Sequence, residues 1–172
     1  RHGQSTFNKE KRFTGWLDPG LTNLGFKQAK EVARKLKGKK FEIAFCTSLK
    51  RSKQTLKEVL KYHPECVKTI EDDRMIERNY GDLNGKLHSE FIRKIGKKIY
   101  KLEVEGDIIT DLDKKGRKEV EKFLGEEEYD LIHRGFYVRP SNGESFADVE
   151  KRVKKFIKDL IKMMKKKRVN VV

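Results

Sequence analysis

Apolar residues along the chain follow two alternating periodicities. Between Asn23 and Lys37 they lie three or four positions apart, which is typical of one face of a helix, and Thr22 is a suitable N-cap. Phe41 to Cys46, after Gly38, is instead a short apolar run of the kind that forms a strand. The chain is therefore predicted to form a helix and then a strand in this region.

The alternation continues toward the middle of the chain. We predict a second helix from a cap at Thr47-Ser48 to about Leu60, and a strand from Val67 to Ile70. Residues 91–124 are Lys-rich and weakly apolar, which favours peripheral helices with breaks at Gly106 and Gly116. Alternating strands and helices predict an α/β domain with a largely parallel sheet.

A long amphipathic helix is predicted near the end of the chain. Its apolar stripe consists of Val149, Val153, Phe156, Ile157, Leu160, Ile161 and Met164. The β-branched run at 169–172 then predicts a strand with no loop after it. Since this end and the start at Arg1 both look cut, we expect residues 1–172 to be one domain with residues missing on both sides.

The formal net charge of +15 comes from 42 Lys and Arg against 27 Asp and Glu, and 30 of the cations are Lys. Lys is a hydrated point charge that lacks the planar fork with which Arg recognises phosphates. The densest basic run, from Lys151 to Arg168, is the polar face of the long helix. We interpret the charge mainly as solvated helix surface, and keep binding of nucleic acid or another polyanion as the less favoured alternative.

Composition excludes several classes of protein. No stretch approaches the roughly 18 apolar residues of a membrane span, so an integral membrane protein is excluded. Cys46 and Cys66 are too few for a disulfide scaffold, and His63, His88 and His133 have no paired ligand spacing. We predict a cytoplasmic protein that uses no metal ion.

Candidate chemistry lies in the predicted loops. Arg1 and His2 are adjacent, and Gly3 allows the backbone to approach a ligand closely. Asn8 follows, and Arg51 lies in the first turn of the second helix, directly after a strand end, where helix N-termini favour anions. These residues predict a phosphate pocket around an imidazole nucleophile. The alternatives are a structural His2 and a solvent-facing Arg51.

Glu77 is the candidate general acid and base. Transfer of a phosphoryl group from histidine to an alcohol requires a group that takes the proton of the hydroxyl and later returns one. Tyr80 and Gly81 follow closely and suggest a constrained loop. On local sequence alone, an ion pair of Glu77 with Arg78 or Arg74 is an equal alternative.

Several segments recur in a familiar order. They are Arg1 to Ser5 with Asn8 and Arg12 to Asp18, then Thr47 to Ser52, Glu77 to Gly85, His133 to Phe136 with Pro140, and Gly143 to Ser145. This series resembles the cofactor-dependent phosphoglycerate mutases of the histidine phosphatase superfamily, from Arg1 to about Arg152. The resemblance implies a three-layer α/β sandwich in which helices flank a mostly parallel central sheet. Residues 95–123 interrupt it, and we predict a helical insertion there.

The resemblance also implies a role for each matching position. His2 would become phosphohistidine, and Glu77 would be the acid/base residue. The residues implied to bind phosphate or substrate are Arg1, Ser5, Asn8, Thr14, Gly15, Arg51, Tyr80, His88, His133 and Arg134. The implied activity is the interconversion of 3-phosphoglycerate and 2-phosphoglycerate in glycolysis and gluconeogenesis. The primer of this reaction would be 2,3-bisphosphoglycerate, and the binding partner would be a small phosphorylated three-carbon acid. The resemblance is also compatible with a homo-oligomer.

Three positions depart from the pattern of these mutases. Asn79 stands where they usually have His, His88 where they have Lys, and His133 where they have the first Arg of a pair. An imidazole is mostly neutral at pH 7, so binding of a second anionic group would weaken. A phosphatase of small phosphate esters therefore stays open as an alternative. The second active-site histidine of the family would follow the final strand, beyond Val172.

Overall fold

The computed structural model describes residues 1–104 and 114–172. The first half holds α1 (Thr6–Lys9), α2 (Asn23–Leu36), β1 (Ile43–Cys46), α3 (Lys50–Leu60), β2 (Lys68–Glu71), η1 (Asp73–Met75) and η2 (Gly81–Leu83). The second half holds α4 (His88–Ile99), the π-helical turn η3 (Tyr100–Val104), α5 (Lys114–Arg134) and α6 (Phe146–Lys167). Among the described residues, no helix combines the length and apolar character needed to cross a membrane.

A small parallel sheet forms the centre of the body. β1 and β2 pair in parallel, with Ile43 opposite Lys68. The last residues of the chain lie along the other edge of β1, where the amide of Phe45 donates to the carbonyl of Val172 at 2.7 Å. A parallel bridge joins Ile43 to Val171. The strand predicted at 169–172 is therefore present as one bridge with its flanking hydrogen bonds.

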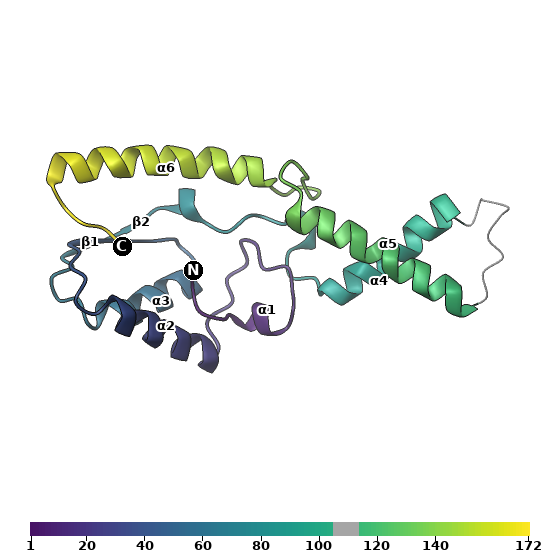
Figure 1. Cartoon of the computed structure of the whole chain (residues 1–172), viewed down its shortest axis with the longest axis horizontal. Coiled ribbons are helices and arrows are strands. Elements are labelled where there is room, and N and C mark those ends of the chain that lie inside the picture. Colours follow the sequence, from purple (N-terminus) through teal and green to yellow (C-terminus); the bar gives the residue numbers. More distant parts are fainter. Residues whose placement is uncertain (105–113) are drawn as a thin grey trace.

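Helices cover both faces of the sheet (Figure 1). α6 lies on one face, where Phe156 packs against Phe45 of β1 with ring centroids 5.3 Å apart. α2 and α3 lie on the other, where Ala33, Phe41 and Val59 form a buried cluster. The predicted fold class, an α/β fold with helices flanking a parallel sheet, is confirmed.

The apolar stripe of α6 is covered only in part. Phe156 is 6% exposed, whereas Ile157 and Ile161 are 45% and 47% exposed. The lysines on the opposite face are exposed, as expected of a solvated face. Periodicity therefore located the helix correctly but overestimated how much of its apolar face is buried.

Two predicted boundaries are wrong. α3 is preceded by Leu49, which provides no side-chain cap, whereas the amide of Thr47 donates to Ser52 Oγ at 3.1 Å. Gly116 lies inside α5 and does not break it, because a single glycine costs a helix only about 1 kcal/mol relative to alanine. Gly106 lies outside the described residues.

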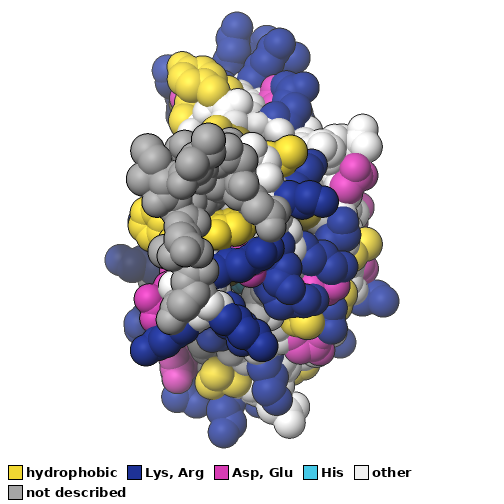
Figure 2. All heavy atoms as spheres, turned by 90° about the vertical axis from the view of Figure 1, so that its right-hand side faces the viewer, with side chains coloured by type: hydrophobic (Ala, Val, Ile, Leu, Met, Phe, Trp, Pro, Cys, Tyr) yellow, Lys and Arg dark blue, Asp and Glu magenta, His cyan; other side chains and the backbone are white. Residues whose placement is uncertain are grey.

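α4 and α5 form a helical arm that projects from the body (Figure 1). Their backbones touch where Gly96 crosses Gly125, since a Cβ on either residue would collide with a backbone carbonyl of the opposite helix. Of the segment predicted as a helical insertion at 95–123, the described residues 95–104 and 114–123 lie in this arm, and residues 105–113 are outside the described part of the chain. Seen from the end of the arm, Lys and Arg side chains crowd the surface with a few carboxylates between them (Figure 2).

Candidate active site

His2 and Arg51 meet just beyond the carboxyl end of β1. Arg51 lies in the first turn of α3, and its Nε donates to Nε2 of His2 at 3.2 Å. Its two terminal nitrogens donate to the carbonyls of Leu17 at 2.7 Å and Gly15 at 2.8 Å. Because these bonds use all three guanidinium nitrogens and the side chain is only 1% exposed, the cation is fixed beside the imidazole.

The imidazole of His2 is held in the form that a nucleophile requires. Nδ1 lies 2.7 Å from the carbonyl of Gly3, so Nδ1 carries the proton and Nε2 presents its lone pair. Burial lowers the pKa of His2, and the charge of Arg51 lowers it further. Gly3 packs directly on the backbone of Gly25 in α2, where a Cβ would not fit. His2 is therefore a neutral, oriented base.

Glu77 lies in the same cavity as His2. The cavity has a volume of about 510 Å³, and Arg1, His2, Arg51, Glu77 and Arg78 form its polar wall. Its apolar wall includes Phe45, Val59, Ile76, Phe146 and Val172. The carboxylate of Glu77 is exposed, and its charge partly offsets the lowering of the pKa of both His2 and Arg51. An imidazole, a carboxylate and several cations thus line one cavity.

Arg78 is a residue of this cavity that sequence reasoning missed. It is 2% exposed, and its guanidinium lies over the rings of Tyr80 at 4.5 Å and Phe146 at 4.1 Å. One terminal nitrogen donates to the carbonyl of Ile132 at 2.8 Å, while Nε and Nη1 have no hydrogen-bond partner among the described residues. The only signal in the sequence was its position next to Glu77. These two free donors suit an anionic ligand.

The ion pairs considered as alternatives for Glu77 are not formed. Arg74 binds Asp72 and Asp159, each at 2.6 Å. The guanidinium of Arg78 is held by the carbonyl and the rings named above. Neither guanidinium therefore binds Glu77, although Oε1 of its carboxylate accepts from the backbone amide of Arg78 at 3.2 Å.

The other residues predicted near the N-terminus take structural or neighbouring positions. Asn8 lines a second cavity of about 340 Å³ together with Arg1 and His2. Ser5 is fully buried as the N-cap of α1, where its Oγ accepts from the amide of Asn8 at 3.2 Å. Thr14 is buried in the adjoining turn, and Gly15 contacts the site through its carbonyl bond with Arg51.

Tyr80, His88 and His133 belong to an aromatic group that we call the imidazole cluster, completed by Phe13 and Tyr129. Phe13 is 1% exposed, with its ring centroid 4.6 Å from that of His88 and 5.2 Å from that of His133. The hydroxyls of Tyr129 and Tyr80 lie 3.0 Å and 3.4 Å from Nδ1 of His88 and His133, respectively. The Nε2 atoms of both histidines are buried with no partner among the described residues.

The two histidines of the imidazole cluster are neutral. Burial lowers the pKa of His88, and burial with the neighbouring charges lowers that of His133 to about 4. Arg134, the remaining predicted cation, has a side chain that is 79% exposed and pairs with Asp130 of its own helix at 3.5 Å. The structure therefore brings Arg1, His2, Arg51 and Glu77 together in one cavity. It places no positive charge beside them from His88, His133 or Arg134, the residues expected to bind a second anionic group.

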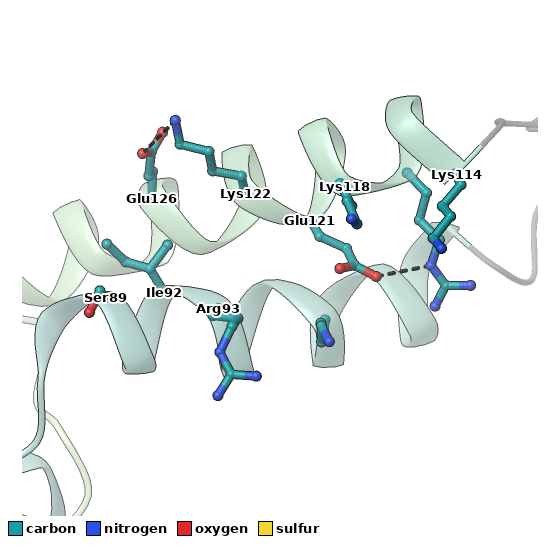
Figure 3. Close-up of a pocket in the computed structure, with 10 residues that line it drawn as sticks. Ser89, Ile92, Arg93, Lys114, Lys118, Glu121, Lys122 and Glu126 are labelled. Carbon is teal, nitrogen blue, oxygen red and sulfur yellow. Dashed lines mark hydrogen bonds and ion pairs between the residues drawn. The ribbon is translucent and has the colours of Figure 1, made fainter.

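A larger cavity, of about 790 Å³, lies between α4 and α5 (Figure 3). Lysines and arginines dominate its lining, and its two carboxylates, Glu121 and Glu126, are bonded to cations of their own helix. None of the described lining residues is a histidine or cysteine. Nor does any group of three or more His, Cys, Asp or Glu in the described part of the chain suit a metal ion. The His2 cavity is the better candidate for chemistry.

The chain is similar to known proteins in sequence and in structure. The sequence model of a family described as "Histidine phosphatase superfamily (branch 1)" matches residues 1–105. The chain is 33% identical over 156 residues to the 2,3-bisphosphoglycerate-dependent phosphoglycerate mutase of Bartonella henselae. That match covers 89% of this chain, which spans 62% of the relative.

Two solved structures show the same fold. A phosphoglycerate mutase from Bacillus anthracis matches all of this chain and 70% of its own, at 25% identity and a TM-score of 0.69. A mycobacterial glucosyl-3-phosphoglycerate phosphatase matches 95% of this chain and 62% of its own, at 22% identity and a TM-score of 0.66. Proteins named as mutases and as phosphatases are thus both similar to this chain.

Proposed function

We propose that this chain, which belongs to the histidine phosphatase superfamily, transfers phosphoryl groups through a phosphohistidine formed on His2. The observation that carries the proposal is the 3.2 Å contact between a buried arginine, Arg51, and the lone-pair nitrogen of a neutral imidazole. Glu77 in the same cavity supplies the acid/base group that such a transfer needs.

The proposed first step is displacement at phosphorus. Nε2 of His2 attacks the phosphorus of a phosphate monoester, the bond from phosphorus to the ester oxygen breaks, and Glu77, protonated for this step, gives its proton to the departing oxygen. The Nε–H of Arg51 moves from Nε2 of His2 to the phosphoryl oxygens. The two unpartnered donors of Arg78 would bind the same phosphoryl group. Fixed donors of this kind stabilise the charge that develops in the transition state.

The specific activity we propose is that of a phosphoglycerate mutase. The named relatives support this substrate, and the donors of Arg51 and Arg78 fit the phosphoryl group that 2,3-bisphosphoglycerate would supply as primer. After the first step, Glu77 as a carboxylate would take the proton of the acceptor hydroxyl, which then receives the group from His2. The apolar wall of the cavity favours exclusion of water, which would otherwise hydrolyse the phosphohistidine.

A phosphatase of small phosphate esters is the second candidate. The observation that favours it is the neutral, buried state of His88 and His133 together with the outward position of Arg134. A carboxylate or second phosphate on the substrate would find no fixed cation at these positions. Water would then replace the sugar-acid hydroxyl as acceptor.

Replacement of the nucleophile tests the shared step. In the full protein, His2→Ala should abolish acid-labile phosphate labelling, because no other nitrogen occupies the place of Nε2. Circular dichroism of the variant shows whether it folds, and His2→Gln offers a closer match in size. Normal labelling or normal turnover in a folded variant would show that His2 is not the nucleophile.

A coupled assay separates the two candidate activities. For a mutase, conversion of 3-phosphoglycerate to 2-phosphoglycerate should depend on added 2,3-bisphosphoglycerate, with little release of inorganic phosphate. Release of phosphate as the main activity, at the same rate with and without 2,3-bisphosphoglycerate, would contradict the mutase and favour the phosphatase.

A further inference from the structure

Glu77 lies in a segment without regular secondary structure, between η1 and η2. A general acid must come within hydrogen-bond reach of the leaving oxygen, and a misplacement of about 1 Å can cost 10²-fold in rate. An irregular segment does not fix its own backbone through a repeating ladder of hydrogen bonds. The position of Glu77 must therefore come from contacts with other parts of the fold.

Arg152, in the second turn of α6, contacts the backbone of this segment twice. Its Nη1 donates to the carbonyl of Arg74 at 2.9 Å, and its Nη2 donates to the carbonyl of Glu77 at 3.1 Å. The carbonyl of Glu77 also accepts from Nε1 of Trp16 at 2.8 Å. The backbone at Glu77 is thus held from two sides, and its side chain is left facing the cavity.

Glu144, which directly precedes the N-cap of α6, holds the segment on the other side of Glu77. Its carboxylate accepts from the amide of Asn79 at 2.9 Å, and its own amide donates to the carbonyl of Asn79 at 2.8 Å. The same carboxylate binds Arg152 at 3.0 and 3.1 Å. Both side chains are only 18% exposed, so water competes little for these bonds.

The start of α6 is a firm support for these contacts. Ser145 and Asp148 form a reciprocal capping box, in which each side chain accepts from the backbone amide of the other residue. Arg139 binds the carboxylate of Asp148 at 2.7 Å nearby and does not contact Glu77. This second ion pair at the same helix end provides a matched control.

We propose that Arg152 and Glu144 are positioning residues that fix the backbone on both sides of Glu77, so that its carboxylate reaches the group leaving from His2. This inference rests on the proposed acid/base role of Glu77. Arg152 uses its planar fork to reach two carbonyls and a carboxylate at once. A lysine has a single ammonium and cannot reproduce that geometry.

The dependence of the rate on the leaving group tests the proposal. The alkoxide that leaves when 2,3-bisphosphoglycerate phosphorylates His2 needs a proton, whereas 4-nitrophenolate leaves without one. In Arg152→Gln, single-turnover phosphohistidine formation from 2,3-bisphosphoglycerate should fall by roughly 10–100-fold, part of the full effect of a general acid. The burst of 4-nitrophenolate from 4-nitrophenyl phosphate should change by less than about 3-fold, since the acid is not needed there.

Three further variants define the result. Glu77→Gln should show the same selective loss, Arg152→Lys should not restore the rate, and Arg139→Gln should behave as wild type on both substrates. Equal losses on both substrates in a folded Arg152→Gln variant would show a merely structural role and overturn the proposal. An unchanged rate with 2,3-bisphosphoglycerate would also overturn it.

Hydrogen exchange tests the contact without any assay of activity. In Glu144→Ala the amide of Asn79 loses its acceptor and should exchange at least about 10-fold faster. Glu150→Ala, which removes an exposed carboxylate paired with Lys154, should leave that amide unchanged. An unchanged Asn79 amide in Glu144→Ala overturns the positioning role. A wild-type protein that forms no phosphohistidine overturns the proposed function instead, and the exchange result still decides the contact.

Discussion

Arg51 is a buried cation whose hydrogen-bond partners are all uncharged. Its guanidinium binds two carbonyls and an imidazole, and it forms no ion pair within the described part of the chain. A buried charge that has no direct ion pair is costly unless a ligand supplies one. The state of this residue therefore indicates an anionic ligand more directly than the total charge of the protein does.

Replacement of Arg51 should show how much its geometry contributes. Arg51→Lys keeps the charge but loses the paired bonds to Gly15 and Leu17, so the ammonium is no longer held beside His2. We expect phosphohistidine formation to slow by roughly 10²-fold, about 2–3 kcal/mol of transition-state stabilisation. Rapid quench with labelled substrate measures this rate.

Lys53→Arg is the control on the same helix, because Lys53 is paired with Glu71 outside the cavity. It should leave the rate unchanged. A wild-type rate in Arg51→Lys would mean that a charge alone is sufficient at this position.

The protonation state of His2 gives a second prediction at the scale of the residue. Burial and Arg51 lower its pKa below 6.5, so the neutral nucleophile persists as the pH falls through that value. The 4-nitrophenolate burst should decline as the pH falls, with a midpoint below that of an ordinary histidine. In Arg51→Gln the decline should begin at a higher pH, because the repulsive charge is gone. A wild-type midpoint at or above 6.5 would contradict this.

At the scale of the element, the crossing of α4 and α5 depends on two glycines. The helices touch through the backbone at Gly96 and Gly125, and a methyl group at either position meets the carbonyl of Glu121 or Ile92. Glycine normally weakens a helix by about 1 kcal/mol relative to alanine. Here the close contact between helices outweighs that local preference.

Gly96→Ala should therefore destabilise the protein despite its better helix propensity. We expect a loss of about 1–3 kcal/mol in the free energy of unfolding, as for other overpacked contacts. Urea unfolding followed by circular dichroism measures it. Lys98→Ala, on the exposed side of α4, should be neutral within about 0.5 kcal/mol. Equal stability of Gly96→Ala and wild type would show that the helices can separate without cost.

At the scale of the whole molecule, the imidazole cluster joins the arm to the body. Phe13 and Tyr80 come from loops of the body, whereas His88 comes from α4, and Tyr129 and His133 come from α5. The contact is built from neutral rings, two of which can gain a proton. Its stability should therefore depend on pH.

Acidification should weaken the fold in a defined window. The pKa of a histidine is near 6.5 in the unfolded chain, whereas the pKa of His133 in the folded protein is about 4. Between these two pH values the unfolded state therefore binds more protons than the folded state. As the pH falls through this window, the unfolded state is stabilised relative to the folded state. The melting temperature should drop from pH 6.5 to about 5, above the range in which most carboxylates titrate. His133→Phe should flatten this slope. A melting temperature independent of pH in that window would contradict a buried neutral His133.

The sequence by itself determined the local features of this protein. Hydrophobic periodicity predicted the helices that the structure has at Asn23–Leu36 and Lys50–Leu60 and the strand between them. The reason is that apolar residues at a regular spacing lie on one face of an element, and that face is the one that becomes buried. The position of Arg51 after a strand end predicted that it would lie close to Arg1 and His2, and all three line one cavity.

Only the tertiary structure decided which side chains meet across long separations. It buried His88 and His133 in a neutral cluster, placed Arg78 in the wall of the cavity, and set Arg152 against the carbonyl of Glu77, 75 residues away. It also turned Gly96 and Gly125 into a contact between helices. Such contacts depend on how elements pack in three dimensions, and the spacing of residues along one segment carries no information about its partner.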